Sequence, residues 1–340
     1  MYICTSKLVA IMMHRTDNLS KNTRVAILST VFFVSLLLLL LALWVCNYCI
    51  NAEAHARYVG VTNVASEKIA KTISGMEMNA MNVFDEVQKH MDSPEAVVDA
   101  LMSKTSLNPD VRGYFAAFEP EYFPEKGRWY EPYAHQTDST HEFEITQVGS
   151  ARHNYTQSDW YMKAKELKAS FWSDPYYYYD GTSISGHYCT FVEPIYNAEG
   201  KLACVCGADM TFEWLAKELE QIDLESKQDD LLNLYVFNQE QDFYTAVLNG
   251  DGSCLAYPEG QKVAIDDEDV LKDLKQRKSG FKKMTINGEN ATVYYGPIRN
   301  INWVTAVIVP AYEVQKPILM IGLTLFIVML LGMIIIYKLL

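Results

Sequence analysis

Two long apolar segments, one near each end of the chain, constrain its fold more than any other feature. Residues 25–46 and 317–337 consist almost entirely of apolar or small side chains. Each segment has about twenty residues, the length that an α-helix needs to cross a hydrocarbon core of roughly 30 Å. No third stretch of the sequence has this character. We therefore expect two transmembrane helices with residues 47–316 between them.

Basic residues near the first segment predict its orientation. Four of them precede it, against one acidic residue: Lys7, Arg15, Lys21 and Arg24. Positive charge next to a span stays preferentially in the cytoplasm. We therefore expect residues 1–24 and the C-terminal end to be cytoplasmic, and residues 47–316 to be extracytoplasmic. A cleaved signal peptide is the alternative for residues 25–46, but such peptides have a shorter apolar stretch of roughly 7–15 residues.

The segment between the spans is strongly acidic. Residues 51–315 hold 23 of the 29 basic and 41 of the 42 acidic residues, a net charge of −18. Nucleic-acid binding requires clustered positive charge, so nucleic acid is excluded as a partner. The negative charge favours cationic ligands or simply keeps the domain soluble.

Of the seven cysteines, three lie near or in the first span, and the other four are Cys189, Cys204, Cys206 and Cys254. Cys204 and Cys206 are two residues apart on a predicted strand, so their side chains point to the same face. A disulfide between Cys189 and one of them is one alternative, and buried free thiols are the other. The Cys-x-Cys pair lacks a second pair of ligands at zinc-site spacing, so no metal site is predicted.

One long helix is predicted from the first span onward. Residues 51–93 contain no proline, and apolar residues recur there at spacings of three and four. The apolar positions are Ala65, Ile69, Ile73, Met76, Ala80, Val83, Val87 and Met91. Forty helical residues extend roughly 60 Å. We expect residues 47–91 to form a stalk that continues the span at 25–46 and supports two packed domains.

Two strand-rich units follow the stalk, over residues 92–222 and 230–312. In the first unit we expect short helices near 94–104, 159–169 and 211–222, a loop at 120–132, and strands at 113–118, 142–148, 176–179, 187–195 and 202–208. In the second we expect a helix at 267–277 and strands at 234–237, 246–248, 254–257, 280–286, 291–297 and 303–309. An Asn287-Gly288 hairpin turn joins two of these strands. The order predicts an α+β fold with antiparallel, PAS-like sheets.

This organisation resembles the bacterial double-Cache (dCache) sensor domains over roughly residues 50–315. The resemblance rests on the two spans, the long helix and a series of short motifs: Trp160-Tyr161, Trp172-Ser173-Asp174-Pro175-Tyr176, Pro194-Ile195, Gly207-Ala208-Asp209-Met210-Thr211, the stretch 248–258 and the strand that begins at Trp303. It implies two PAS-like antiparallel sheets packed on the long helix. The membrane-distal sheet (92–222) would bind a small ligand, and the membrane-proximal sheet (230–312) would relay the signal.

The resemblance also implies a set of ligand-binding residues. In the amino-acid-binding branch of the family, an Arg clamps the ligand carboxylate, and an Asp holds its ammonium group beside a Trp-Tyr pair and further Tyr residues. The pattern carries over as Trp160, Tyr161, Tyr176 and Asp209. His153 and Ser158 stand where the family has its first Tyr and its Arg. A serine hydroxyl offers no bidentate cationic fork for a carboxylate, so an amine is favoured over a free α-amino acid.

The resemblance thus predicts the sensing part of a receptor in the bacterial inner membrane, working as a homodimer. No cofactor, metal or enzymatic activity is expected, because the sequence shows no constellation of nucleophile, base or metal ligands. The signal would pass to a cytoplasmic module of a longer receptor or to a membrane partner. The alternative is an adhesion or protein-binding ectodomain, which predicts a large exposed apolar patch. A sensor predicts an enclosed cavity lined by aromatic side chains.

Overall fold

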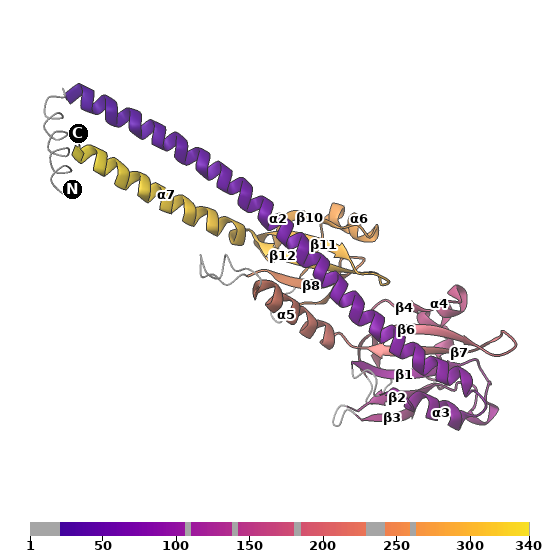
Figure 1. Cartoon of the computed structure of the whole chain (residues 1–340). Coiled ribbons are helices and arrows are strands. Elements are labelled where there is room, and N and C mark those ends of the chain that lie inside the picture. The colour runs from indigo at the N-terminus through magenta and orange to yellow at the C-terminus, as the bar shows by residue number, and fades with distance from the viewer. Residues whose placement is uncertain are drawn as a thin grey trace.

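A single helix, α2 (Lys21–Lys89), extends through most of the molecule and carries both sheets (Figure 1). This computed structural model describes residues 21–105, 110–137, 142–179, 185–228, 242–258 and 263–339. The 69 residues of α2 correspond to roughly 100 Å at 1.5 Å per residue. The segments predicted as first span and stalk are therefore one uninterrupted helix, and most of the predicted cytoplasmic segment 1–24 lies outside the described residues.

The C-terminal half of α2 is amphipathic, as its sequence period predicts. Seven of the eight predicted stripe positions are buried: Ala65, Ile69, Ile73, Met76, Ala80, Val83 and Val87. The eighth, Met91, is half-buried and lies beyond the end of the helix at Lys89. Burying this continuous stripe against the sheets stabilises the helix far more than its intrinsic propensity does.

The distal sheet has the strand order β3-β2-β1-β7-β6-β4, and β5 pairs with β6. All its pairs are antiparallel. Its strands are β1 (Val111–Phe118), β2 (Pro132–Gln136), β3 (Phe143–Gln147), β4 (Phe171–Trp172), β5 (Tyr176–Tyr179), β6 (Ser185–Tyr196) and β7 (Leu202–Met210). Its helical segments are α3 (Pro94–Met102), η2 (Pro124–Lys126), η3 (Tyr155–Gln157) and α4 (Asp159–Leu167). The sequence did not predict β2 or the two-residue β4.

The proximal sheet has the order β10-β11-β12-β8-β9, again antiparallel throughout. Its strands are β8 (Tyr244–Asn249), β9 (Cys254–Ala256), β10 (Gly280–Ile286), β11 (Glu289–Pro297) and β12 (Trp303–Pro310), and α6 (Glu268–Lys275) packs beside them. The helix α5 (Glu213–Gln228) leads from the distal unit towards this sheet. The strand predicted at 234–237 lies outside the described residues. The α+β class with two antiparallel sheets on a long helix is confirmed.

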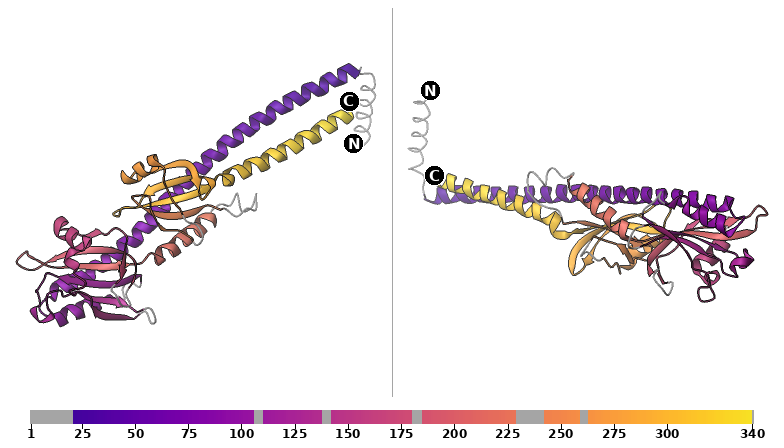
Figure 2. Two further views of the ribbon diagram at one scale, coloured as in Figure 1. Left: turned by 180° about the vertical axis from the view of Figure 1, so that it is seen from behind. Right: turned by 90° about the horizontal axis from the view of Figure 1, so that it is seen from below.

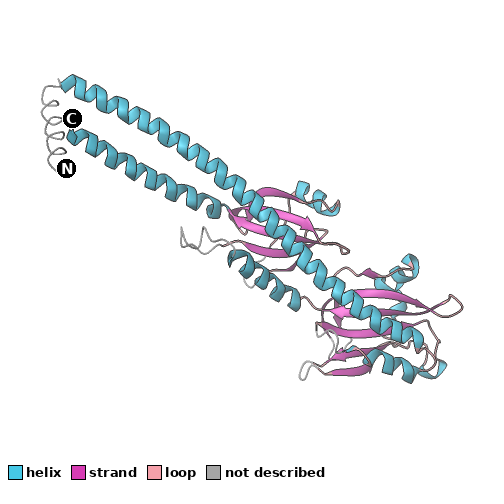
Figure 3. Ribbon diagram, in the orientation of Figure 1, coloured by secondary structure: helices cyan, strands magenta, loops and turns pink. Residues whose placement is uncertain are grey.

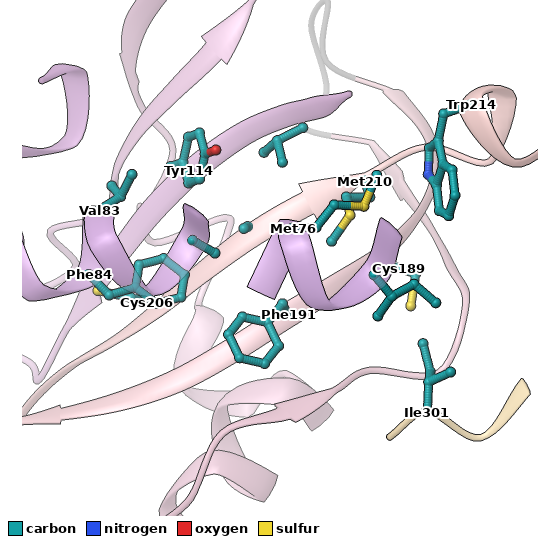
Figure 4. Close-up of a cluster of buried hydrophobic side chains, with 14 of the residues drawn as sticks. Met76, Val83, Phe84, Tyr114, Cys189, Phe191, Cys206, Met210, Trp214 and Ile301 are labelled. Atoms are coloured by element: carbon teal, nitrogen blue, oxygen red, sulfur yellow. The ribbon is translucent and has the colours of Figure 1, made fainter. Parts of the chain in front are cut away.

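The two sheets lie one after the other along α2, as Figure 3 shows, and the views in Figure 2 show α2 covering both. One hydrophobic cluster joins α2, the inner face of the distal sheet and part of the proximal unit. Figure 4 shows Met76, Val83 and Phe84 of α2 over this sheet, with Ile301 of the proximal unit reaching the same cluster. The opposite face of the distal sheet packs against α4.

The C-terminal helix α7 (Ala311–Leu339) begins directly after β12 and packs along the N-terminal half of α2. Within the described part of the chain, α2 and α7 are the two helices long and apolar enough to cross a membrane. A Cβ atom built on Gly322 of α7 would lie 3.1 Å from Leu43 of α2, so the two helices approach closely there.

The disulfide alternative for Cys189 is wrong, because all the described cysteines are free thiols. Cys189 on β6 lies opposite Met210 of β7, whereas Cys204 and Cys206 lie opposite Ile195 and Glu193. The Cys189 thiol instead donates a hydrogen bond to the backbone oxygen of Ser173, 3.1 Å away. Buried free thiols, the other alternative, are what the fold contains.

Candidate ligand-binding site

A cavity lies on the face of the distal sheet that points away from α2. Side chains along β1 alternate between the two faces of the sheet. Tyr114 and Phe118 pack on the face towards α2, whereas Phe115 packs on the opposite face, where the cavity lies. The cavity is lined by Phe115, Glu131, Tyr133, Val148, His153, Trp160, Tyr176, Tyr178 and Asp209. These residues come from four strands, α4 and the loops beside them.

The cavity has a narrow inner part and a wider outer part. The inner part has a volume of about 30 Å³, which is enough for about two water molecules. The outer part has a volume of about 320 Å³ and shares His153, Trp160, Tyr176 and Tyr178 with it. Ser158, Lys163 and Asp174 contribute to the outer rim. The outer volume alone falls in the usual range for small-molecule sites.

Two glycines let aromatic rings form the floor of the cavity. A Cβ atom on Gly207 of β7 would lie 2.1 Å from the ring of Phe115, and one on Gly113 of β1 would lie 2.5 Å from the ring of Tyr133. Any larger residue would displace these rings. The strands therefore need glycine at both positions so that the two rings can pack directly against the backbone.

Asp209 is the buried carboxylate at the inner end of the cavity. Its side chain is on β7, the residue is only 7% exposed, and it accepts a hydrogen bond of 2.6 Å from the Thr190 hydroxyl and one of 3.3 Å from the Tyr176 hydroxyl. Burial raises the pKa of Asp209 to about 6, although these hydrogen bonds partly oppose the shift. Burial thus disfavours the ionised form of this carboxylate more than its hydrogen bonds favour it.

Glu131 is a second buried carboxylate in the same cavity. It is 4% exposed, and its Oε2 atom lies 3.4 Å from Nε2 of His153. Burial raises the pKa of Glu131, His153 opposes the shift, and the nearby charge of Asp209 adds to it. The residues that line the inner cavity include two carboxylates and one imidazole but no lysine or arginine.

Aromatic side chains surround these charges. The ring of Trp160 lies 4.9 Å from that of Phe115, and the imidazole of His153 lies 5.5 Å from the ring of Tyr178. Burial raises the pKa of the Tyr133 hydroxyl, and the negative charge of Asp209 adds to this shift. Electron-rich ring faces and carboxylates together form a surface complementary to a cation.

The structure brings five of the six predicted site residues to this cavity. Asp209, Trp160, Tyr176 and His153 line its inner part, and Ser158 lines the outer part. Tyr161 lies elsewhere: it is buried in the cluster beneath α4, and its hydroxyl donates to Glu119 at 2.8 Å. Consecutive residues of a helix point about 100° apart, so Trp160 and Tyr161 face different ways. Whether these residues bind a ligand stays a prediction.

Sequence reasoning missed five residues that line the inner part of the cavity: Phe115, Glu131, Tyr133, Val148 and Tyr178. Glu131 lies within the predicted loop 120–132, and Tyr133 is on the unpredicted strand β2. A signal for Tyr178 was available, because it alternates with Tyr176 on β5 and so shares its face. No group of three or more potential metal ligands occurs among the described residues.

Comparison with known proteins agrees with this architecture. Residues 97–217 match the family model of the methyl-accepting chemotaxis protein-like first PDC sensor domain. No curated protein matches the chain in sequence. The match covers the distal unit, including most of the cavity.

Several solved structures share the fold of the whole extramembrane region. An extracellular domain assigned to the histidine kinase mmHK1S-Z3 has a TM-score of 0.61 at 18% identity, covering 78% of this chain and 97% of that one. The ligand-binding domain of the Pseudomonas fluorescens chemoreceptor CtaA, in complex with L-isoleucine, has a TM-score of 0.52 at 16% identity, covering 79% and 97%. The ligand-binding domain of Mlp24 with asparagine has a TM-score of 0.55 at 14% identity, covering 80% and 98%.

The chain therefore contains a sensor domain of the Cache type, as found in transmembrane receptors. The distal unit matches the methyl-accepting chemotaxis protein-like first PDC sensor domain over residues 97–217, and the resemblance to double-Cache sensor domains is confirmed.

Proposed function

We propose that this chain is the extracytoplasmic sensing part of a bacterial inner-membrane receptor, and that its distal cavity binds a small cationic amine. The observation that carries the proposal is the burial of Asp209 and Glu131 together in an aromatic cavity. An ammonium group in hydrogen-bonding distance of Asp209 would stabilise the charge that burial now disfavours. Trp160 and Tyr178 would add cation–π contact.

An amine fits this cavity better than a free α-amino acid does. The solved relatives hold L-isoleucine and asparagine, each of which carries a carboxylate beside its ammonium group. In this chain Ser158 lies at the outer rim, where the family pattern has its arginine. Lys163 of α4 lines the outer part of the cavity, but it is exposed, and its Nζ lies 4.8 Å from the centre of the Phe171 ring. Screened by water, such a charge is a weak carboxylate clamp.

The membrane arrangement follows from the two apolar helices and the acidic domain between them. We propose that α2 and α7 both cross the inner membrane, that residues 47–316 face the periplasm, and that two copies pair along the long helix. A conformational difference between the free and bound states would then reach the cytoplasm through the helices, and act on a further module or a partner. The chain itself would act as a non-enzymatic receptor.

The experiment is a binding screen of the full chain in detergent against matched ligands. Primary amines of two to six carbons, the alcohols of the same shape, α-amino acids and carboxylates are compared by thermal shift, and hits are titrated by calorimetry. We expect the amines to stabilise the protein and the alcohols to have no effect. Loss of a buried charge partner costs about 2–5 kcal/mol, so Asp209→Asn should weaken amine binding at least ~30-fold.

Asp174→Asn is the matched control, because Asp174 is an exposed carboxylate at the rim of the same cavity. Its substitution should change the affinity less than about threefold. A preferred ligand that has a carboxylate but no amine would contradict the proposal, and so would equal weakening by the two substitutions.

A further inference from the structure

Three aromatic rings join the two units at the end of the distal sheet. Trp303, the first residue of β12, is 3% exposed. Its ring centre lies 5.7 Å from that of Phe212 and 6.4 Å from that of Trp172. Both partners belong to the distal unit, whereas Trp303 belongs to the proximal one. We call these three residues the aromatic bridge.

The distal side of the bridge is directly connected to the proposed ligand site. Phe212 follows Asp209 by three residues, just beyond the end of β7. Trp172 precedes Ser173, whose hydroxyl oxygen accepts a hydrogen bond of 2.9 Å from the Thr190 amide. The Thr190 side chain in turn donates to Asp209 at 2.6 Å. A change at the Asp209 carboxylate therefore acts on residues adjacent to both rings.

The two distal rings differ in how they are held. The indole nitrogen of Trp172 donates a hydrogen bond of 2.7 Å to Glu77 on α2, which fixes this ring to the long helix. Phe212 lies at the junction of β7 and α5, where its backbone oxygen accepts a hydrogen bond of 3.2 Å from the amide of Ala216. Movement of β7, which carries Asp209, would therefore shift Phe212 relative to Trp172. Trp303 contacts both rings.

The proximal side of the bridge leads to the membrane. β12 extends from Trp303 to Pro310, pairs with β11 on one side and β8 on the other, and continues without a loop into α7 at Ala311. A strand hydrogen-bonded on both edges moves as a rigid element. A displacement of Trp303 is therefore passed to the start of the C-terminal helix, which packs against α2.

We propose that the aromatic bridge couples the distal ligand site to α7, with Trp303 as the residue that transmits the change. The proposal builds on the proposed amine-binding function, because it names how occupancy of that site would be communicated. Cavity occupancy shifts Phe212 against Trp303, β12 follows, and α7 moves relative to α2. The buried contact of Asp223 on α5 with Thr245 on β8 holds the same two units together without contacting Trp303.

The test uses the full chain in nanodiscs, with cysteines at Leu43 and Gly322 as the reporter of α2–α7 movement. Cys4, Cys46 and Cys49 are replaced by serine to remove other thiols near the reporter. The oxidative cross-linking rate is measured with and without the best amine from the ligand screen. In the parent protein we expect the amine to change this rate at least threefold.

Three substitutions separate coupling from stability. Trp303→Leu keeps an apolar side chain but removes the ring, and should bind the amine within about threefold of the parent affinity while losing at least two thirds of the cross-linking response. Trp303→Phe should retain more than half of the response. Val304→Ala truncates the adjacent buried residue, which packs in the separate core of the proximal unit, and should leave the response intact.

A parent response that is absent, a full response in Trp303→Leu, or an equal loss in Val304→Ala would each overturn the proposal. If the parent binds no amine, the proposed ligand class is wrong. Calorimetric unfolding without ligand then tests whether the aromatic bridge couples the two units. The bridge predicts one cooperative transition for the two units of the parent and of Val304→Ala, and two transitions for Trp303→Leu. One transition in Trp303→Leu, or two in the parent, would overturn it.

Discussion

Asp209→Asn should make the sensor domain more stable while it weakens amine binding. In the free protein the buried Asp209 carboxylate has its pKa raised from 3.8 to about 6 by desolvation. This difference corresponds to about 3 kcal/mol by which folding disfavours the ionised form at neutral pH. Asparagine has nearly the same shape and can still accept a hydrogen bond from Thr190, but it has no charge to bury.

The size and the sign of the effect depend on pH. A carboxyl whose pKa is higher in the folded state binds its proton more tightly there, so the wild-type protein gains stability as the pH falls from about 7 through 6 towards 4. Above pH 7 the full cost of the charge is present. The asparagine variant lacks this dependence. We expect it to be more stable than wild type by about 1–3 kcal/mol at pH 7.5, because no charge is buried. Weaker hydrogen bonds of the amide offset part of this gain.

The assay is thermal and urea unfolding of the fragment 51–315 between pH 4 and 8, with near-ultraviolet circular dichroism as the signal. A gain of 2 kcal/mol raises the melting temperature of a domain of this size by about 4–8 °C. Asp174→Asn, at an exposed position, should change stability by less than about 0.5 kcal/mol. A variant at Asp209 that is less stable at pH 7.5, or whose stability difference from wild type is the same at pH 4 and 8, would refute the reasoning.

Three further outcomes follow from the same structure. Amine affinity should fall about tenfold between pH 7 and pH 5 in calorimetric titrations, because an acid with a pKa of about 6 changes from mostly ionised to mostly protonated over this interval; a pH-independent affinity would contradict this. Gly207→Ala should cost about 1–3 kcal/mol in urea unfolding, since its Cβ atom would overlap the Phe115 ring, and a cost below 0.5 kcal/mol would show that the ring moves freely. Thr245→Val should cost about 1.5–3 kcal/mol, because it removes the 2.5 Å hydrogen bond to the buried Asp223 carboxylate; unchanged stability would mean that water replaces the hydroxyl.

The spacing of apolar residues and the turn motifs predicted the parts of this fold that depend on interactions between residues close in sequence. The spacing of apolar residues in 51–91 predicted the buried stripe of α2, and the Asn287-Gly288 turn predicted the hairpin of β10 and β11, in which Asn287 adopts a positive φ of 52°. β2 was missed because its five residues follow a loop rich in proline and aromatic residues and are stabilised by pairing with β1 and β3. Such pairing is a tertiary property that a short window of sequence does not contain.

In the candidate site, too, some residues were predicted from the sequence, whereas others depend on tertiary contacts. Asp209 and Trp160 were found because the family pattern identifies them, but Tyr161 was carried over with its neighbour although one helical step turns it into the core. Glu131 was missed because its role depends on a fold that brings it beside Asp209, 78 positions further along the chain. A carboxylate in a loop has no local feature that distinguishes a buried partner from a solvated one.

The central claim is that the distal cavity recognises positive charge through Asp209. The most direct measurement is a calorimetric cycle that titrates one amine and its uncharged alcohol analogue into wild type and Asp209→Asn. The account predicts that the two changes are coupled: wild type should prefer the amine at least ~30-fold, equivalent to about 2 kcal/mol, and the variant should not distinguish the two ligands. An equal preference for the amine in both proteins, or no binding of any amine to wild type, would contradict it.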